Sequence, residues 1–256
     1  MKNRVNKSNW TSVLIVLFFL FSCSPTGEEQ IELKDAQAYN DRGFTYAEKG
    51  QFDQAISDFN KALEMNPNLA MAYNNRGRVY ALKRQFDQAI LDFNRALEID
   101  PRYAMAYNNR SGAYAKKGQY DKAISDSNRA LEINPSYAEA YYNRGFAYTK
   151  KGQYDEAISD YSKALEMNTL LLSEAYTNRG FAYMKKGQYD QAIFDCTKAL
   201  EINPTNMVAY RHRSRAYYLK KDYDKSWDDV AKIRELGHEI APQFIDDLRK
   251  ASGRQK

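Results

Sequence analysis

Few residues of this 256-residue chain could carry out catalysis or hold a metal ion. The only histidines are His212 and His238, and the only cysteines are Cys23 and Cys196. A zinc site needs several such ligands at short spacings, and a cysteine nucleophile needs a neighbouring base. The spacing of these residues suits neither, and no phosphate-cradling glycine loop is present. We therefore expect no enzyme activity, no cofactor and no bound metal, and we interpret Cys196 as a buried apolar residue.

Cys23 belongs to a different kind of sequence at the N-terminus. A basic start is followed by nine apolar residues, Val13–Phe21, and then by Ser22. Because a bilayer span needs about 20 residues, residues 1–22 indicate a cleaved export signal. The junction Leu-Phe-Ser-Cys resembles the processing box of bacterial lipoproteins, which implies that Cys23 is lipidated and begins the mature protein. An ordinary signal peptide with a chance cysteine is the alternative.

The residues after Cys23 predict how the chain is attached. Residues 24–35 are polar and lack a helical face, so residues 23–35 are predicted to form the lipidated cysteine and a flexible tether of about 20 Å. Serine at position 24, directly after the cysteine, resembles the sequence of lipoproteins that are sent on to the outer membrane. The resemblance therefore implies an exported bacterial lipoprotein, anchored in the cell envelope through its acyl chains.

Two rows of charged residues recur with a period of 34 residues, at positions 7 and 23 of six repeated units. The arginines are Arg42, Arg76, Arg110, Arg144, Arg179 and Arg213, and the aspartates are Asp58, Asp92, Asp126, Asp160, Asp195 and Asp229. Each row adjoins a face on which two helices would meet, where a guanidinium needs a counter-charge. We predict an ion pair between the two helices of each unit. A ligand-binding row of arginines is the alternative.

The unit that positions these charges is first seen in Ala36–Leu69. Aromatic and small residues share one face of each of two predicted helices: Tyr39, Gly43 and Tyr46 in the first, and Ala55, Phe59 and Ala62 in the second. Gly50 and Gln51 interrupt the helical pattern between them, and Pro67 ends the second helix. The unit is therefore predicted to be a helical hairpin.

The spacing Tyr-x2-Arg-Gly-x2-Tyr, then Ala-x3-Phe, then Pro resembles the tetratricopeptide repeat, with Tyr for its usual Trp and Arg for its usual Leu. The resemblance implies an all-α, right-handed superhelical solenoid of six helix-turn-helix hairpins. The predicted repeats are residues 36–69, 70–103, 104–137, 138–172, 173–206 and 207–240. Residues 241–256 are expected to form a capping helix and tail, in which Phe244, Ile245 and Leu248 cover the end of the stack.

Two repeats depart from the pattern. Ser111 and Ser127 replace a glycine and an aromatic residue in repeat 3, which predicts looser packing there. Repeat 4 lacks its proline and gains one residue in the leucine run 170–172. We expect this insertion to change the angle between repeats 4 and 5, with a small binding surface formed by exposed leucines as the alternative.

The resemblance implies that a protein or peptide is held in a concave groove, which positions 2, 5, 6 and 9 of the first helices would line. The candidates at positions 5 and 6 are Asn40, Asn74, Asn75, Asn108, Asn109, Asn143 and Asn178. Amide side chains could pair with the backbone of an extended peptide, although they could instead simply solvate an exposed face. Apolar contact would come from Phe44, Phe146 and Phe181, and Arg211 and Arg215 could attract acidic residues. Capture of a C-terminal carboxylate is not expected, because Asn40, Met105 and Asn109 stand where the family's carboxylate-clamp members carry lysine and arginine.

These observations predict a lipid-anchored scaffold for protein–protein interactions at the bacterial cell envelope. Basic and acidic residues alternate through every repeat, which argues against a nucleic-acid partner. In its size, anchor and repeat number the chain resembles lipoproteins that assist the assembly of pili or outer-membrane barrels. The alternative is an accessory or regulatory subunit of an envelope enzyme, such as a peptidoglycan hydrolase or synthase.

Overall fold

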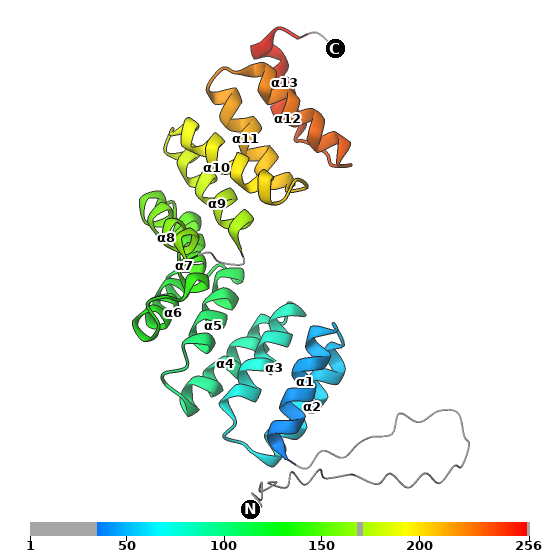
Figure 1. The fold of residues 1–256 in the computed structure, drawn as a ribbon, viewed down its shortest axis with the longest axis vertical. Helices are drawn as coiled ribbons and strands as arrows, with labels where there is room; N and C mark the ends of the chain where they lie inside the picture. The colour runs from blue at the N-terminus through cyan, green and yellow to red at the C-terminus, as the bar shows by residue number, and fades with distance from the viewer. Residues whose placement is uncertain (1–34, 168–170, 255–256) are drawn as a thin grey trace, which may run out of the picture. The chain divides into compact units, whose positions relative to one another are not determined.

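The computed structural model describes residues 35–167 and 171–254, in which every regular element is a helix (Figure 1). The predicted export signal, Cys23 and most of the tether lie outside the described residues, as does Leu170. The helices are α1 (Ala36–Glu48), α2 (Phe52–Met65), α3 (Ala70–Leu82), α4 (Phe86–Ile99), α5 (Ala104–Lys116), α6 (Tyr120–Ile133), α7 (Ala138–Lys151), α8 (Tyr154–Glu166), α9 (Leu172–Lys185), α10 (Tyr189–Ile202), α11 (Met207–Leu219), α12 (Tyr223–Glu235) and α13 (Pro242–Ser252). None of these helices has the length and apolarity that a membrane span requires.

The first twelve helices form six hairpins, in which each odd-numbered helix packs against the helix that follows it. In three hairpins the contact pairs a glycine of the first helix with a ring of the second: Gly43 with Phe59, Gly77 with Phe93, and Gly145 with Tyr161. A Cβ atom added to Gly43 would lie 2.9 Å from Cε1 of Phe59, which is fully buried. Only glycine therefore fits this crossing, and the predicted hairpin is confirmed.

Each hairpin turn contains one residue in the left-handed conformation, at position 15 of the repeat. This residue is glycine in four repeats, with φ between 73° and 78°: Gly50, Gly118, Gly152 and Gly187. Arg84 and Lys221 occupy the same position with φ of 62° and 65°. A residue with a Cβ atom is disfavoured there by roughly 1–2 kcal/mol, so packing and the closing backbone bonds must hold these two turns.

Successive hairpins are joined by a lysine at the end of one first helix and an aspartate at the start of the preceding second helix. The pairs are Lys83–Asp53, Lys117–Asp87, Lys151–Asp121, Lys186–Asp155 and Lys220–Asp190. The aspartates are exposed, so each pair contributes little alone. Their regular recurrence nevertheless shows that the hairpins stack in a constant register.

The extra residue of repeat 4 does not disturb this register. Lys186 reaches Asp155 over 31 residues, whereas Lys83 reaches Asp53 over 30. Likewise Arg179 bonds to Ser162 over 17 residues, whereas the same contact spans 16 residues in the preceding repeats. The insertion is therefore accommodated between α8 and α9. The expected change of angle at this junction stays a prediction, and Leu171 and Leu172 are half-buried.

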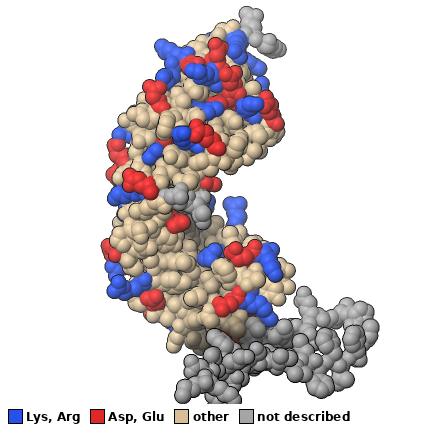
Figure 2. Space-filling model, in the orientation of Figure 1, with Lys and Arg blue, Asp and Glu red and all other residues tan. Residues whose placement is uncertain are grey.

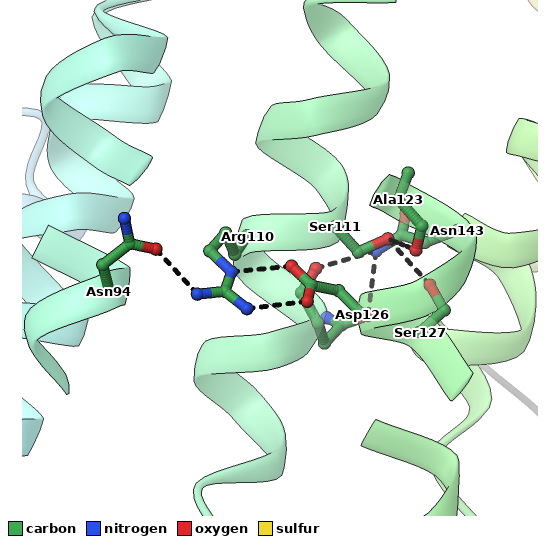
Figure 3. A network of polar contacts seen from close by, with 8 residues as sticks. Asn94, Arg110, Ser111, Ala123, Asp126, Ser127 and Asn143 are labelled. Carbon is green, nitrogen blue, oxygen red and sulfur yellow. Dashed lines mark hydrogen bonds and ion pairs between the residues drawn. The ribbon is translucent and has the colours of Figure 1, made fainter. Parts of the chain in front are cut away.

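In repeat 3, two serines form a hydrogen-bonded contact where the sequence predicted only a weaker one. Ser111 is fully buried, its Oγ donates to the carbonyl of Ala123 at 2.8 Å, and it lies 2.7 Å from Oγ of Ser127 (Figure 3). In repeat 6, Ser214 pairs with Ser226, which stands at the position that alanine holds in the other repeats. Paired hydroxyl groups satisfy each other where no ring is present.

The C-terminal end of the stack is covered as predicted. Ile245 and Leu248 of α13 are buried with Val230 of α12, and the ring of Phe244 packs against Tyr218. Arg254 pairs with Asp224 over 30 residues, the same spacing as the lysine–aspartate pairs between hairpins. The capping helix thus continues the contacts that another first helix would make.

Candidate functional site

The predicted ion pairs between the two helices of each hairpin are confirmed in all six repeats. Each arginine donates from Nε and Nη2 to the two carboxylate oxygens, at 2.6 to 3.0 Å. The six aspartates are at most 7% exposed. Burial raises the pKa of Asp195, and the hydrogen bonds from Arg179 oppose that shift. Such a forked contact fixes how the two helices face each other.

Five of these arginines also reach the preceding hairpin through Nη1. The acceptors are Asn60, Asn94, Asn128, Ser162 and Thr197, at 2.5 to 3.0 Å. Figure 3 shows this arrangement for Arg110, which lies between Asn94 of α4 and Asp126 of α6. Because three of the donor atoms are engaged within the fold, the arginine row holds the repeats together and is not the ligand surface.

The asparagines at positions 5 and 6 bond to one another across adjacent hairpins. Nδ2 of Asn75, Asn109 and Asn143 donates to Oδ1 of Asn40, Asn74 and Asn108 respectively, at 2.8 to 3.1 Å. Asn178 donates instead to the hydroxyl of Tyr142 at 3.0 Å. We call this set the asparagine ladder, and it lies between the first helices of successive hairpins.

Burial of the ladder corrects the expectation that these side chains line an exposed face. Asn40 and Asn74 have no exposed surface, and Asn75 and Asn108 are at most 8% exposed. Asn40 and Asn74 are therefore closed to a ligand, whereas Asn108 keeps a small exposed surface and lines a pocket together with Asn109 and Asn143. Asn109, Asn143 and Asn178 are half-buried, so these three keep some surface that a peptide could reach.

A second set of side chains on the first helices is exposed or half-buried. We call it the aromatic–cation row, formed at positions 9 and 13 by Phe44, Arg78, Lys116, Phe146, Lys150, Phe181, Lys185 and Arg215. The remaining places at these two positions hold Glu48, Leu82, Gly112 and Leu219. Cations lie over the rings: Lys150 Nζ is 5.1 Å from the ring centre of Phe146, and Lys185 Nζ is 5.5 Å from that of Phe181. Among the ion pairs of the described residues, none involves a cation of this row. On the face drawn in Figure 2, basic and acidic side chains are interspersed.

Two of the pockets formed by the described residues lie along the first helices and have volumes of several hundred Å³. The larger, of about 430 Å³, lies where α11 meets α13 and is lined by Arg211, Arg215 and Phe244 among others. Arg211 donates to the backbone carbonyl of Glu239 at 2.7 Å, and Cζ of Arg215 lies 5.2 Å from the ring centre of Phe244. The two arginines predicted to attract acidic residues therefore do lie together.

His212 lines the same pocket and was not predicted to contribute to a site. Its ring lies 4.9 Å from that of Phe181, centre to centre. Burial, together with the positive charges of Arg211 and Lys185, lowers its pKa to about 4. The imidazole is therefore neutral at physiological pH and packs as part of the wall.

The second pocket, of about 290 Å³, lies between α3, α5 and α7 around Gly112. Gly112 stands at position 9, where Phe44, Phe146 and Phe181 stand in other repeats. The signal in the sequence is the order Ser111-Gly112, where four other repeats have glycine followed by phenylalanine or arginine.

Cys196 is fully buried, as predicted, and burial raises the pKa of its thiol to about 12. Within residues 35–167 and 171–254, no three His, Cys, Asp or Glu residues lie close enough together to hold a metal ion.

Stacked helical hairpins with a shared register and a terminal cap define a helical-repeat solenoid. Models of the tetratricopeptide repeat match residues 34–102, 93–125 and 138–168 with 173–206, and a further TPR repeat model matches residues 112–152. The chain therefore belongs to the tetratricopeptide repeat family.

Several solved structures share this fold. MamA is 32% identical, with 65% of this chain and 90% of MamA aligned at a TM-score of 0.56. YrrB, described as a TPR protein with an unusual peptide-binding site, is 26% identical over 69% of this chain and 91% of its own, at a TM-score of 0.55. PilW, described as a type IV pilus biogenesis factor, is 18% identical over 82% of this chain and 97% of its own, at a TM-score of 0.74. At this identity the likeness shows the fold alone. No curated protein sequence matches the chain.

Proposed function

We propose that the chain is a lipid-anchored scaffold that holds an extended segment of a partner protein along its aromatic–cation row, at the bacterial cell envelope. The observation that carries this proposal is the row itself. It places large apolar rings next to cations that have no carboxylate partner among the described residues, and it does so repeatedly along the stack. Interfaces use such aromatic and cationic side chains as anchors.

Other features support a binding role and no chemistry of its own. The fold is one whose members act as interaction scaffolds, and the similar protein YrrB is described as having a peptide-binding site. The arginine row and the asparagine ladder bond adjacent hairpins to each other, which would organise the surface before a partner arrives. A preorganised surface loses little freedom on binding.

The envelope location rests on the sequence before the solenoid. The short apolar run and the Leu-Phe-Ser-Cys junction favour lipidation of Cys23, and the polar residues that follow would let the solenoid stand off the membrane. A partner would then be an envelope protein, either one being assembled there or an envelope enzyme that the scaffold regulates.

Site-specific photocrosslinking in intact cells tests where the partner binds. A photoreactive phenylalanine analogue replaces Phe146, which lies in the row on α7. The matched control carries the analogue at Leu91 of α4, which is 67% exposed but outside the row. We expect a crosslinked protein from position 146 and none from position 91. The reverse result would place the partner on the second helices and contradict the proposal, and the identity of the captured protein separates assembly from enzyme regulation.

A further inference from the structure

We infer that the pocket around Gly112 receives one apolar side chain from an acidic segment of the partner. This inference rests on the proposed function of the aromatic–cation row. The pocket interrupts that row between Arg78 of α3 and Phe146 of α7. Its position makes it a subsite for a single residue of an extended chain.

The fold does not require a glycine at this position. A Cβ atom added to Gly112 would meet only Nδ2 of Asn143, at 3.9 Å, which is an ordinary contact. By contrast, a Cβ atom on Gly77 would lie 2.7 Å from the ring of Phe93. Glycine weakens the interior of a helix relative to alanine. Because Gly112 has no side chain, the pocket stays open.

The pocket has an apolar floor formed by the buried or half-buried side chains of Phe86, Phe93 and Ala113. Its volume of about 290 Å³ lies just below the range of roughly 300–1,000 Å³ typical of sites for drug-sized ligands. The space suits one leucine, methionine or phenylalanine side chain, whose burial would remove apolar surface from water.

The polar part of the lining carries two cations, the amides of Asn108, Asn109 and Asn143, and no acidic residue. The cations are Arg78 and Lys116, and neither has an ion-pair partner among the residues described. The neighbouring Lys83 and Lys117 differ, since they pair with Asp53 and Asp87. Two available cations beside an apolar floor are complementary to a peptide in which acidic residues flank an apolar one.

Fluorescence polarisation with synthetic peptides tests the inference. The probe is a labelled peptide in which one leucine lies between pairs of glutamates, and its two counterparts carry Leu→Ala or Glu→Gln. We expect the full-length protein to bind the probe about tenfold more tightly than the alanine peptide, since burial of a leucine side chain has that order of effect. The glutamine peptide should bind more weakly at low salt, and added salt should reduce the difference.

Gly112→Phe fills the pocket with the residue that other repeats carry at this position. It should abolish the preference for leucine over alanine, with unchanged helicity. The matched control is Ser125→Phe, which adds an exposed phenylalanine to α6 at the position that Phe194 occupies in α10. This control should keep the preference.

Two results would overturn the inference. One is that the wild-type protein does not bind the probe or binds the alanine peptide equally well. The other is that Gly112→Phe retains the preference for leucine. One combination of results separates the inference from the proposed function. If Gly112→Phe keeps the preference for leucine while Phe146→Ala weakens binding of all three peptides, the row binds a partner but the pocket is not a subsite. If Phe146→Ala also has no effect, the proposed function fails with it.

Discussion

Removal of the Asp160 carboxylate should destabilise the fourth hairpin by much more than the loss of an average hydrogen bond. Asp160 is 3% exposed and accepts bonds of 2.7 Å from both Nε and Nη2 of Arg144. In Asp160→Ala the guanidinium loses its counter-charge and retains its bond to Asn128. Breaking one side of a buried ion pair costs about 3–5 kcal/mol. We expect about 3 kcal/mol, because the Arg144 side chain is still 18% exposed.

A double-mutant cycle isolates the pair itself. Arg144→Leu combined with Asp160→Ala removes both charges and introduces the leucine that the family usually carries, so most of the lost stability should return. The coupling free energy should be about 2 kcal/mol. Lys151 and Asp121 provide the matched control, because their side chains are 36% and 85% exposed. Their coupling should not exceed about 0.5 kcal/mol.

The assay must resolve one hairpin within a repeat array. Stacked repeats unfold through nearest-neighbour interactions, so a single global transition is not guaranteed. Denaturant unfolding followed by circular dichroism therefore needs to be combined with hydrogen exchange of the α7 and α8 amides, which reports local stability. If the Arg144–Asp160 coupling were no larger than that of the exposed control pair, the ion pairs would not hold the hairpins together and this reasoning would be wrong.

Three further predictions follow from single residues. The pKa of His212 in the folded state is lowered to about 4 from 6.5. The free energy of unfolding should therefore be constant above about pH 6.5 and fall by at most about 3 kcal/mol as the pH drops to 4. His212→Phe should flatten this part of the profile in acid unfolding experiments. Gly77→Ala should lower the melting temperature because its Cβ would clash with Phe93, whereas Gly112→Ala should raise stability by about 1 kcal/mol. Cys23→Ala should move the protein from the membrane to the soluble fraction on cell fractionation, and membrane retention would argue against lipidation.

The hairpin and its ion pair could be predicted because both are contained within one repeat. Tyr39, Gly43 and Tyr46 mark a helix face by their spacing alone, and a partner face follows in the same 34 residues. Once two helices are antiparallel neighbours, Arg42 and Asp58 must lie on the facing sides. Their contact depends only on helical geometry and on a short turn, which are the features that sequence periodicity reports best.

The asparagine ladder could not be predicted in this way, because its bonds join two repeats. Whether position 5 faces solvent or the next hairpin depends on how far successive hairpins rotate, and no pattern within one repeat specifies that rotation. A usable signal was present nonetheless. Asparagines recur 35 residues apart, as in Asn40 and Asn75 or Asn74 and Asn109. Residues that bond across a stacking interface must occur as such pairs.

Bonds between first helices also show how the aromatic–cation row continues past the inserted residue of repeat 4. The bonds that cross the junction keep partners at the corresponding positions of the repeat. Asn178 finds the hydroxyl of Tyr142 over 36 residues, one more than the 35 residues between Asn143 and Asn108. A tyrosine hydroxyl replaces the amide oxygen as acceptor, so the donor remains satisfied. Phe181 therefore stands at the same position of its hairpin as Phe146, and the register of the first helices is kept across the junction.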